Sequence, residues 1–264
     1  MAAPLRVVLS GATGRMGSTL IRLAAADPGL EIVGGLDREG GAACEVGCPV
    51  VRTPEEAEEL VLAADVVVDF SAPEFLARLL RAHADALRGT ALVVGTTGLG
   101  GEEEALLERA SMDSPVLVAA NFSVGVNLLL SLAEQAARVL GPAYDVEVVE
   151  AHHRRKEDAP SGTALALGRA VARGRGVELD AVRRDGRSGR PGARPAGEIG
   201  FHALRGGDVV GEHRVMFLGD RERVELAHLA ADRALFAEGA LRAAAWLAGK
   251  PAGRYTMRQV LGLP

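Results

Sequence analysis

Short continuous apolar runs alternate with amphipathic helical patterns through the first half of the chain. Each run is followed by a turn and then by apolar residues at helical spacing, which predicts strand, turn and helix in repeated order. Strands that are apolar on both faces are typical of a parallel sheet covered by helices on both sides. The strands are predicted over residues 5–10, 31–36, 66–70, 91–94 and 116–119, and the helices over residues 18–26, 74–87 and 102–110.

The pattern changes in the second half, where a long amphipathic helix is predicted over residues 126–140. The last two strands alternate around Gly219-Asp220, which predicts an antiparallel hairpin. The order therefore predicts an α/β half followed by a smaller α+β half with a mixed sheet. Its strands are predicted over residues 146–150, 199–204, 209–217 and 223–229, and its other helices over residues 164–172 and 233–247.

The composition narrows the class of protein. With 264 residues the chain is long enough for two domains, and 48% apolar with 25% charged residues is typical of a globular protein. The formal net charge of −5 predicts no nucleic-acid partner and no membrane attachment. We find neither a signal-peptide pattern nor an apolar run of about 18 residues, so a cytoplasmic location is expected.

Two further stretches carry little chemistry. Cys44 and Cys48 form a single C-x3-C pair without a second pair of ligands, which predicts reduced thiols and no metal site. Residues 183–194 interleave arginine with glycine and proline and contain no aromatic residue. The composition of residues 183–194 predicts a mobile loop rather than a nucleic-acid surface.

A glycine-rich turn stands between the first predicted strand and the first helix. Its G-x-x-G-x-x-G spacing over residues 11–17 suits a tight turn whose backbone N–H groups approach a pyrophosphate, although strand-helix turns also need glycine for packing alone. Asp37 follows where an acid accepts a hydrogen bond from a ribose 2′-hydroxyl, whereas Arg38 can pair with a 2′-phosphate. NADH, NADPH or both are therefore predicted, held by Gly11, Ala12, Thr13, Gly14, Arg15, Met16, Asp37 and Arg38.

Other turns follow the later strands of the predicted sheet. Ligands bind beyond the carboxyl ends of the strands in open α/β sheets, so three such turns on one edge favour a cleft, although each alone is an ordinary βα turn. One turn covers residues 69–73. The other two turns are predicted to contact the cofactor. One contains Gly95, Thr96 and Thr97, and the other contains Ala119, Ala120, Asn121 and Phe122.

A segment rich in histidine and charge covers residues 150–164. Its Lys156 is one of only two lysines among 30 basic residues. A lysine can donate a proton where an arginine holds it, so the residue is a candidate proton donor, although most charge runs are solvated turns. Ser161 stands where an N-cap would begin a helix, and the first-turn N–H groups of Gly162 and Thr163 would suit a carboxylate.

At this point the chain resembles the dihydrodipicolinate reductase family, also called the 4-hydroxy-tetrahydrodipicolinate reductases, almost from end to end. The resemblance is carried by residues 11–17, 69–71, 94–98, 120–127, 150–164 and 207–213. The segment from His152 through Pro160-Ser161-Gly162-Thr163 is its most specific part. Two positions depart from the family pattern: Thr13, where glycine is frequent, and Ala72, where many members have arginine or lysine.

The resemblance implies hydride transfer from NADH or NADPH to 4-hydroxy-tetrahydrodipicolinate, a cyclic dicarboxylate, with loss of water, in lysine and diaminopimelate biosynthesis. It implies His152 as acid/base, Lys156 as proton donor, and a homotetramer built through the sheet of the second domain. The substrate contacts are expected from His153, Ser161, Gly162 and Thr163. We expect a Rossmann-like dinucleotide-binding domain over residues 1–122 and 233–264, and a substrate-binding and oligomerisation domain over residues 123–232.

Two alternatives stay open at this stage. A homoserine or aldose-type dehydrogenase would share the two-domain plan but would need another substrate segment. A redox-sensing NAD-binding regulator would need a DNA-binding module, and no basic recognition helix is visible. His83 and His228 are interpreted as structural, and His202 and His213 receive no role.

Overall fold

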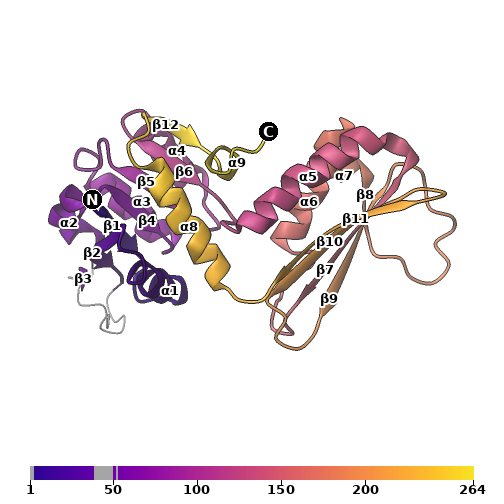
Figure 1. Cartoon of the computed structure of the whole chain (residues 1–264), viewed down its shortest axis with the longest axis horizontal. Helices are drawn as coiled ribbons and strands as arrows, with labels where there is room; N and C mark the ends of the chain where they lie inside the picture. The colour runs from indigo at the N-terminus through magenta and orange to yellow at the C-terminus, as the bar shows by residue number, and fades with distance from the viewer. Residues whose placement is uncertain (1–2, 39–49, 52) are drawn as a thin grey trace. The chain divides into compact units, whose positions relative to one another are not determined.

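The computed structural model describes residues 3–38, 50–51 and 53–264 (Figure 1). The chain forms two compact units, one of Met1–Ser123 with Ala234–Gly262 and one of Val124–Arg233 with Leu263–Pro264. The sequence prediction placed the two junctions after residues 122 and 232. Cys44 and Cys48 lie outside the described residues, so the structure does not address their chemistry.

A parallel sheet forms the centre of the first unit, as predicted. Its strand order is β12-β6-β5-β4-β1-β2-β3, and every neighbouring pair is parallel. The continuous apolar runs form strands here because each strand is covered on both faces. The strands are β1 (Leu5–Ser10), β2 (Leu30–Leu36), β3 (Val50–Val51), β4 (Val66–Asp69), β5 (Ala91–Val94), β6 (Pro115–Val118) and β12 (Gly253–Tyr255).

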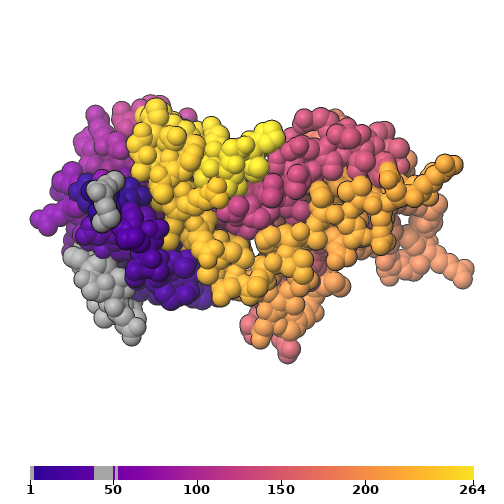
Figure 2. All heavy atoms as spheres, viewed as in Figure 1, coloured from indigo at the N-terminus to yellow at the C-terminus, as the bar shows by residue number. Residues whose placement is uncertain are grey.

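Helices cover both faces of this sheet. Val7 and Leu9 of β1 face one core, which contains residues of α8, and Val8 faces the other, which contains residues of α2, α3 and α4. Figure 2 shows the yellow C-terminal segment lying over the indigo and purple first part of the chain. The helices are α1 (Arg15–Ala24), α2 (Glu58–Ala63), α3 (Pro73–Ala82), α4 (Gly101–Ala110), α8 (Ala234–Leu247) and α9 (Met257–Val260), with a 3-10 turn at Pro54–Glu56.

The second unit contains a mixed sheet with the order β11-β10-β7-β9-β8. The predicted hairpin is confirmed, because β10 and β11 pair antiparallel, whereas β7 and β9 pair parallel. Its strands are β7 (Asp145–His152), β8 (Arg183–Asp185), β9 (Ile199–Arg205), β10 (Gly211–Leu218) and β11 (Arg223–Ala230). Its helices are α5 (Val124–Leu140), α6 (Gly162–Arg175) and α7 (Leu179–Val182), with a 3-10 turn at Gly141–Ala143.

One face of the mixed sheet is covered and the other is open. Val146 and Val148 of β7 pack with Val215 and Phe217 of β10 and with residues of α5 and α6. In Figure 1 these two helices lie along one side of the strands. Alternate residues of the same strands, such as Val149 and Arg214, point to the open face, because side chains alternate along a strand.

The arginine-rich stretch predicted as a mobile loop is anchored instead. It begins with strand β8, and Arg187 and Arg194 donate to Glu147 Oε1 at 2.9 and 3.1 Å. Arg194 also donates to Asp145 Oδ1 at 2.6 Å. The prediction was wrong for residues 183–185, which form β8, and the carboxylates that hold Arg187 and Arg194 stand 40 to 49 residues earlier in the chain, on β7.

Some element ends differ from the predictions. Helix α1 begins at Arg15 rather than residue 18, because Gly14 is extended and serves as its N-cap. Helix α3 ends at Ala82 rather than near residue 87. The short elements α2, α7, β3, β8, β12 and α9 were not predicted, since so few residues give no clear periodicity. Across the described ranges, none of the helices combines the length and apolar character that crossing a membrane requires.

Candidate functional site

The glycine turn joins β1 to α1 at the carboxyl edge of the parallel sheet. Gly11 has φ +80°, and a Cβ placed on it would lie 2.4 Å from the carbonyl oxygen of Phe70. A Cβ on Gly17 would lie 2.3 Å from the carbonyl oxygens of Gly11 and Ala12. Glycine at both positions therefore lets the turn pack against its own helix and against the next strand end.

Several backbone N–H groups of the turn are bonded within the protein, whereas those that open the helix are not; Thr13 donates to Asp37 and Gly14 to the carbonyl oxygen of Gly11. The N–H groups of Gly11 and Ala12 donate to the carbonyl oxygen of Leu36 at 2.8 and 3.1 Å. Helix α1 begins at Arg15, so the first-turn N–H groups of Arg15 and Met16 have no acceptor inside the helix and face beyond its N-terminus. A pyrophosphate would be held by these N–H groups at the start of the helix.

Asp37 lies directly after β2 and is bonded to the same turn. Its Oδ2 accepts the backbone N–H of Thr13 at 2.7 Å and also the Thr13 hydroxyl. Its Oδ1 accepts the backbone N–H of Arg38 at 2.7 Å. The structure thus brings Thr13, Asp37 and Arg38 together where the sequence predicts the adenosine ribose.

A second buried carboxyl links the later turns of this edge. Asp69 accepts the hydroxyl of Ser71 at 2.6 Å and the hydroxyl of Thr96. Burial raises the pKa of Asp69, although these hydrogen bonds act against that shift. Thr96 is therefore a buried structural contact, whereas the neighbouring Thr97 is exposed, and Gly95 packs close to the ring of Phe70.

The last predicted turn of the first unit follows β6. The N–H of Ala119 donates to the carbonyl oxygen of Val94 at 3.0 Å, so this turn continues the sheet edge beside Gly95. Asn121 Oδ1 accepts the N–H of Ser123 at 2.8 Å. Phe122 is buried with its ring centroid 5.6 Å from that of Phe70, while Ala120 is exposed.

In the second unit a buried glutamate organises the histidine-rich segment. Glu150, which is 1% exposed, accepts Nδ1–H of His152 at 2.5 Å and the backbone N–H of Ser161 at 3.0 Å. Arg205 binds both of its oxygens, at 2.7 and 2.8 Å. Burial by itself would raise the pKa of Glu150, but the hydrogen bonds from Arg205, His152 and Ser161 hold it below its usual value.

This arrangement fixes the His152 ring. A carboxylate on Nδ1 selects the tautomer with the proton there and leaves Nε2 as the nitrogen that can exchange a proton. The His213 ring lies edge-on at a centroid distance of 5.1 Å. His213 is the cross-strand neighbour of Glu150, its Nε2 lies 3.2 Å from the Ser161 hydroxyl, and burial lowers its pKa to about 4.

The residues after β7 form a charged loop. Lys156 Nζ lies 2.7 Å from Asp158 Oδ1, and the pKa of Asp158 is held below its usual value by this contact. His153 Nε2 lies 3.3 Å from a guanidinium nitrogen of Arg233. Loss of water contact lowers the pKa of His153, and the positive charge of Arg233 lowers it further.

The N-terminus of α6 lies beside this cluster, as the sequence predicted. Ser161 is the N-cap, and its hydroxyl oxygen accepts the N–H of Ala164 at 3.2 Å. The N–H of Gly162 has no acceptor inside the helix, and a Cβ placed on Gly162 would meet nothing within 4 Å. His152 and Ser161 are therefore joined through Glu150 in one cluster of the second unit, and Gly162 and Thr163 follow Ser161 in the first turn of the helix.

Sequence reasoning missed three residues of this cluster: Glu150, Arg205 and His213. Glu150 stands in an apolar strand at a position that faces the covered side of the sheet, and a carboxylate there signals a buried partner. Arg205 and His213 gave no comparable signal, because they come from strands that approach Glu150 only in the fold. Within the described residues no group of three or more histidine, cysteine or acidic side chains is placed to hold a metal ion.

A parallel sheet with a glycine turn at its carboxyl edge, together with a separate mixed-sheet unit, is the architecture of the Rossmann-like α/β class. Two family models, described as dihydrodipicolinate reductase N-terminus and C-terminus, match residues 5–122 and 125–261. The chain belongs to the dihydrodipicolinate reductase family.

Individual proteins agree with this assignment. The 4-hydroxy-tetrahydrodipicolinate reductase of Myxococcus xanthus is 49% identical, covering 98% of each chain. That of Alkalilimnicola ehrlichii is 47% identical, covering 98% of this chain and 99% of its own. The solved structure of dipicolinate-bound dihydrodipicolinate reductase from Paenisporosarcina sp. TG-14 has a TM-score of 0.75 at 23% identity, covering 96% of this chain and 97% of its own, and shows the same fold.

Proposed function

We propose that this chain catalyses the NADH- or NADPH-dependent reduction of 4-hydroxy-tetrahydrodipicolinate to tetrahydrodipicolinate with loss of water, in lysine and diaminopimelate biosynthesis. Relatives that span the whole chain carry the name of that activity. The observation that carries the proposal is the Glu150 cluster, in which one buried carboxylate binds both the His152 ring and the N-cap of α6. An acid/base group thus lies beside a site that suits an anion.

The substrate would be bound through its carboxylates. The Gly162 and Thr163 end of α6 carries the positive end of the helix dipole, which favours a carboxylate. Lys156 and His153 stand on the loop after β7 and provide further donors. A solved structure with the same fold holds dipicolinate, a planar dicarboxylate, which supports this class of ligand.

Two side chains of this unit would handle the proton. Reduction adds a hydride and a proton to the substrate, and water leaves its ring. Lys156 donates the proton, and Asp158 keeps its ammonium group in place at 2.7 Å. His152 acts as acid/base through Nε2, because Glu150 holds Nδ1 and stabilises the charged imidazolium form.

The first unit would hold the dinucleotide. The glycine turn fits it because Gly11 and Gly17 leave no room for a Cβ, and the N–H groups of Arg15 and Met16 extend beyond the helix. When bound, the reduced nicotinamide supplies the hydride. The exposed Thr97 and Ala120 on the neighbouring turns would line its ring, and Asp37 would bind the adenosine ribose.

The direct test is the loss of absorbance at 340 nm when freshly generated dihydrodipicolinate synthase product is added to the full chain with NADH or NADPH. Oxidation of the cofactor that depends on both enzyme and product supports the proposal. No oxidation with this product, but reduction of NAD⁺ or NADP⁺ when homoserine or an aldose is supplied, would replace it with another dehydrogenase activity.

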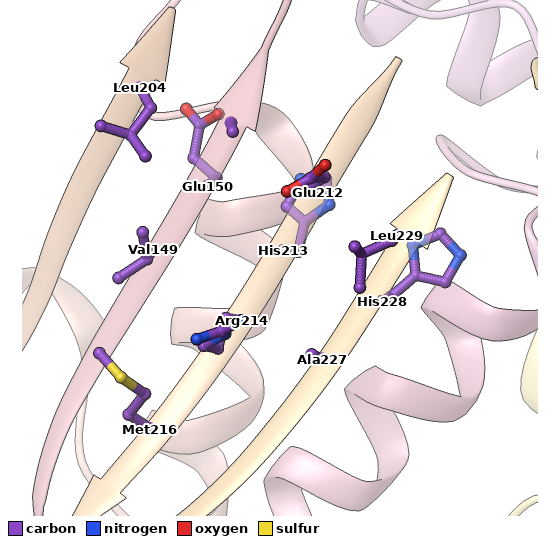
Figure 3. Close-up of a pocket in the computed structure, with 11 residues that line it drawn as sticks. Val149, Glu150, Leu204, Glu212, His213, Arg214, Met216, Ala227, His228 and Leu229 are labelled. Carbon is purple, nitrogen blue, oxygen red and sulfur yellow. The ribbon is translucent and has the colours of Figure 1, made fainter. Parts of the chain in front are cut away.

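We also propose a homotetramer formed through the open face of the mixed sheet. Residues of strands β7, β9, β10 and β11 line a hollow of about 270 Å³ on this face. Figure 3 shows Val149, Arg214, Met216 and Leu229 among the side chains that line it. Leu204 and Leu229 are 57% and 64% exposed there. A patch of exposed leucine on one sheet face favours a partner surface, and a second copy supplies a matching one.

The cytoplasmic location stays a prediction.

A further inference from the structure

The side chain of Thr13, in the glycine turn, has a defined partner. Its hydroxyl and its backbone N–H both donate to Oδ2 of Asp37. Asp37 in turn lies next to Arg38, whose N–H binds the other oxygen at 2.7 Å. The three residues therefore form one hydrogen-bonded unit at the expected ribose end of the nucleotide site.

Protein donors already occupy most of the hydrogen-bond acceptor positions of the Asp37 carboxylate. A carboxylate offers about four acceptor positions, and three of them bind protein donors here. One of these three donors, the Thr13 hydroxyl, is absent when the residue is glycine. A ribose that presents two free hydroxyls to Asp37 would therefore compete with Thr13 for the same oxygen.

The same contact changes how the carboxylate treats a phosphate. Each donor on Asp37 draws its negative charge inward, which reduces its repulsion of a 2′-phosphate. The half-buried Thr13 hydroxyl thus weakens the hydrogen bonds between the ribose of NADH and Asp37. It also reduces the repulsion between Asp37 and the 2′-phosphate of NADPH. Both effects lower the preference for NADH over NADPH.

We infer that the Thr13 hydroxyl is a specificity-determining group that lowers the preference for NADH over NADPH by occupying Asp37 Oδ2. The inference rests on the proposed function, because it places the cofactor ribose at Asp37. It concerns the ratio of two affinities and not the ability to bind a dinucleotide.

The experiment measures dissociation constants of NADH and NADPH by nicotinamide fluorescence with the full chain and its Thr13→Val and Thr13→Ser variants. Valine keeps the branched shape and the backbone N–H but has no hydroxyl. We expect Thr13→Val to shift the affinity ratio towards NADH by about tenfold, the usual weight of one hydrogen bond to a charged group. Thr13→Ser keeps the hydroxyl and should keep the wild-type ratio.

Two controls make the result specific. Thr19→Val removes a hydroxyl from helix α1, which follows the turn; this hydroxyl donates to the carbonyl oxygen of Arg15 at 2.9 Å, and its loss should leave the ratio unchanged. In an Asp37→Ala background, Thr13→Val should no longer move the ratio. An unchanged ratio in Thr13→Val, or an equal loss of both cofactors, overturns the inference, whereas failure of the wild-type chain to bind either cofactor overturns the proposed function itself.

Discussion

Glu150 is a buried carboxylate whose partners come from three different parts of the second unit. Glu150→Gln removes its charge and leaves the guanidinium of Arg205 without a counter-ion. We expect the free energy of unfolding in urea to fall by about 3 kcal/mol, as for other broken buried ion pairs. Arg155→Met is the control, since its pair with Asp208 is exposed and should contribute less than about 1 kcal/mol. Equal losses in the two variants would contradict a structural role for the buried pair.

A variant of Lys156 tests whether this residue donates the proton. Lys156→Arg keeps the positive charge beside Asp158 but holds its proton too tightly to release it. We expect kcat to fall by about 10²–10⁴-fold, the usual weight of general acid catalysis, with nearly unchanged cofactor affinity. Steady-state kinetics with both substrates provide the measurement. A kcat close to wild type would make Lys156 a carboxylate anchor and leave the proton to His152 or water.

At the scale of elements, β7, β10 and the start of α6 meet at His213. Its folded pKa of about 4 lies below the ordinary value of 6.5, so the unfolded chain binds this proton more readily. Its contribution to stability is therefore complete above pH 6.5 and is lost as the pH falls towards 4. Between pH 6.5 and pH 5 we expect wild type to lose about 2 kcal/mol more than His213→Asn in urea unfolding. Because His152, His153, His228, Lys156 and Glu150 are kept in both proteins, parallel slopes would refute this assignment.

The same elements show what a sequence pattern can predict. The parallel sheet, the hairpin and the N-cap at Ser161 follow from periodicity and from local residue types, and the structure confirms all three. The contacts of Glu150 with Arg205, and of Glu147 with Arg187 and Arg194, join residues 40 to 55 positions apart. No local window contains both partners, so the anchored loop and the partners of the buried glutamate could not be predicted.

At the scale of the whole molecule, the open face of the mixed sheet makes oligomeric state testable. Leu229→Glu places a charge in the proposed subunit contact and should shift the mass measured by light scattering to a smaller species. Leu62→Glu on α2 is the matched control, because Leu62 is 62% exposed against 64% for Leu229 and lies in the other unit. A wild-type mass equal to one chain, or no shift in Leu229→Glu, would contradict assembly through this face.

Helix α8 fixes the order in which the two units can be completed during synthesis. Its Ala237, Ala240 and Ala244 belong to the core beside β1 and β4, yet they leave the ribosome after every strand and helix of the mixed-sheet unit. The inserted unit can therefore mature first, while the nucleotide-binding sheet waits with one apolar face uncovered. A chain that stops after residue 233 should bind a hydrophobic dye such as ANS strongly, and one that includes α8 and the segment after it should not. Equal dye binding by the two would mean that the sheet covers this face without α8.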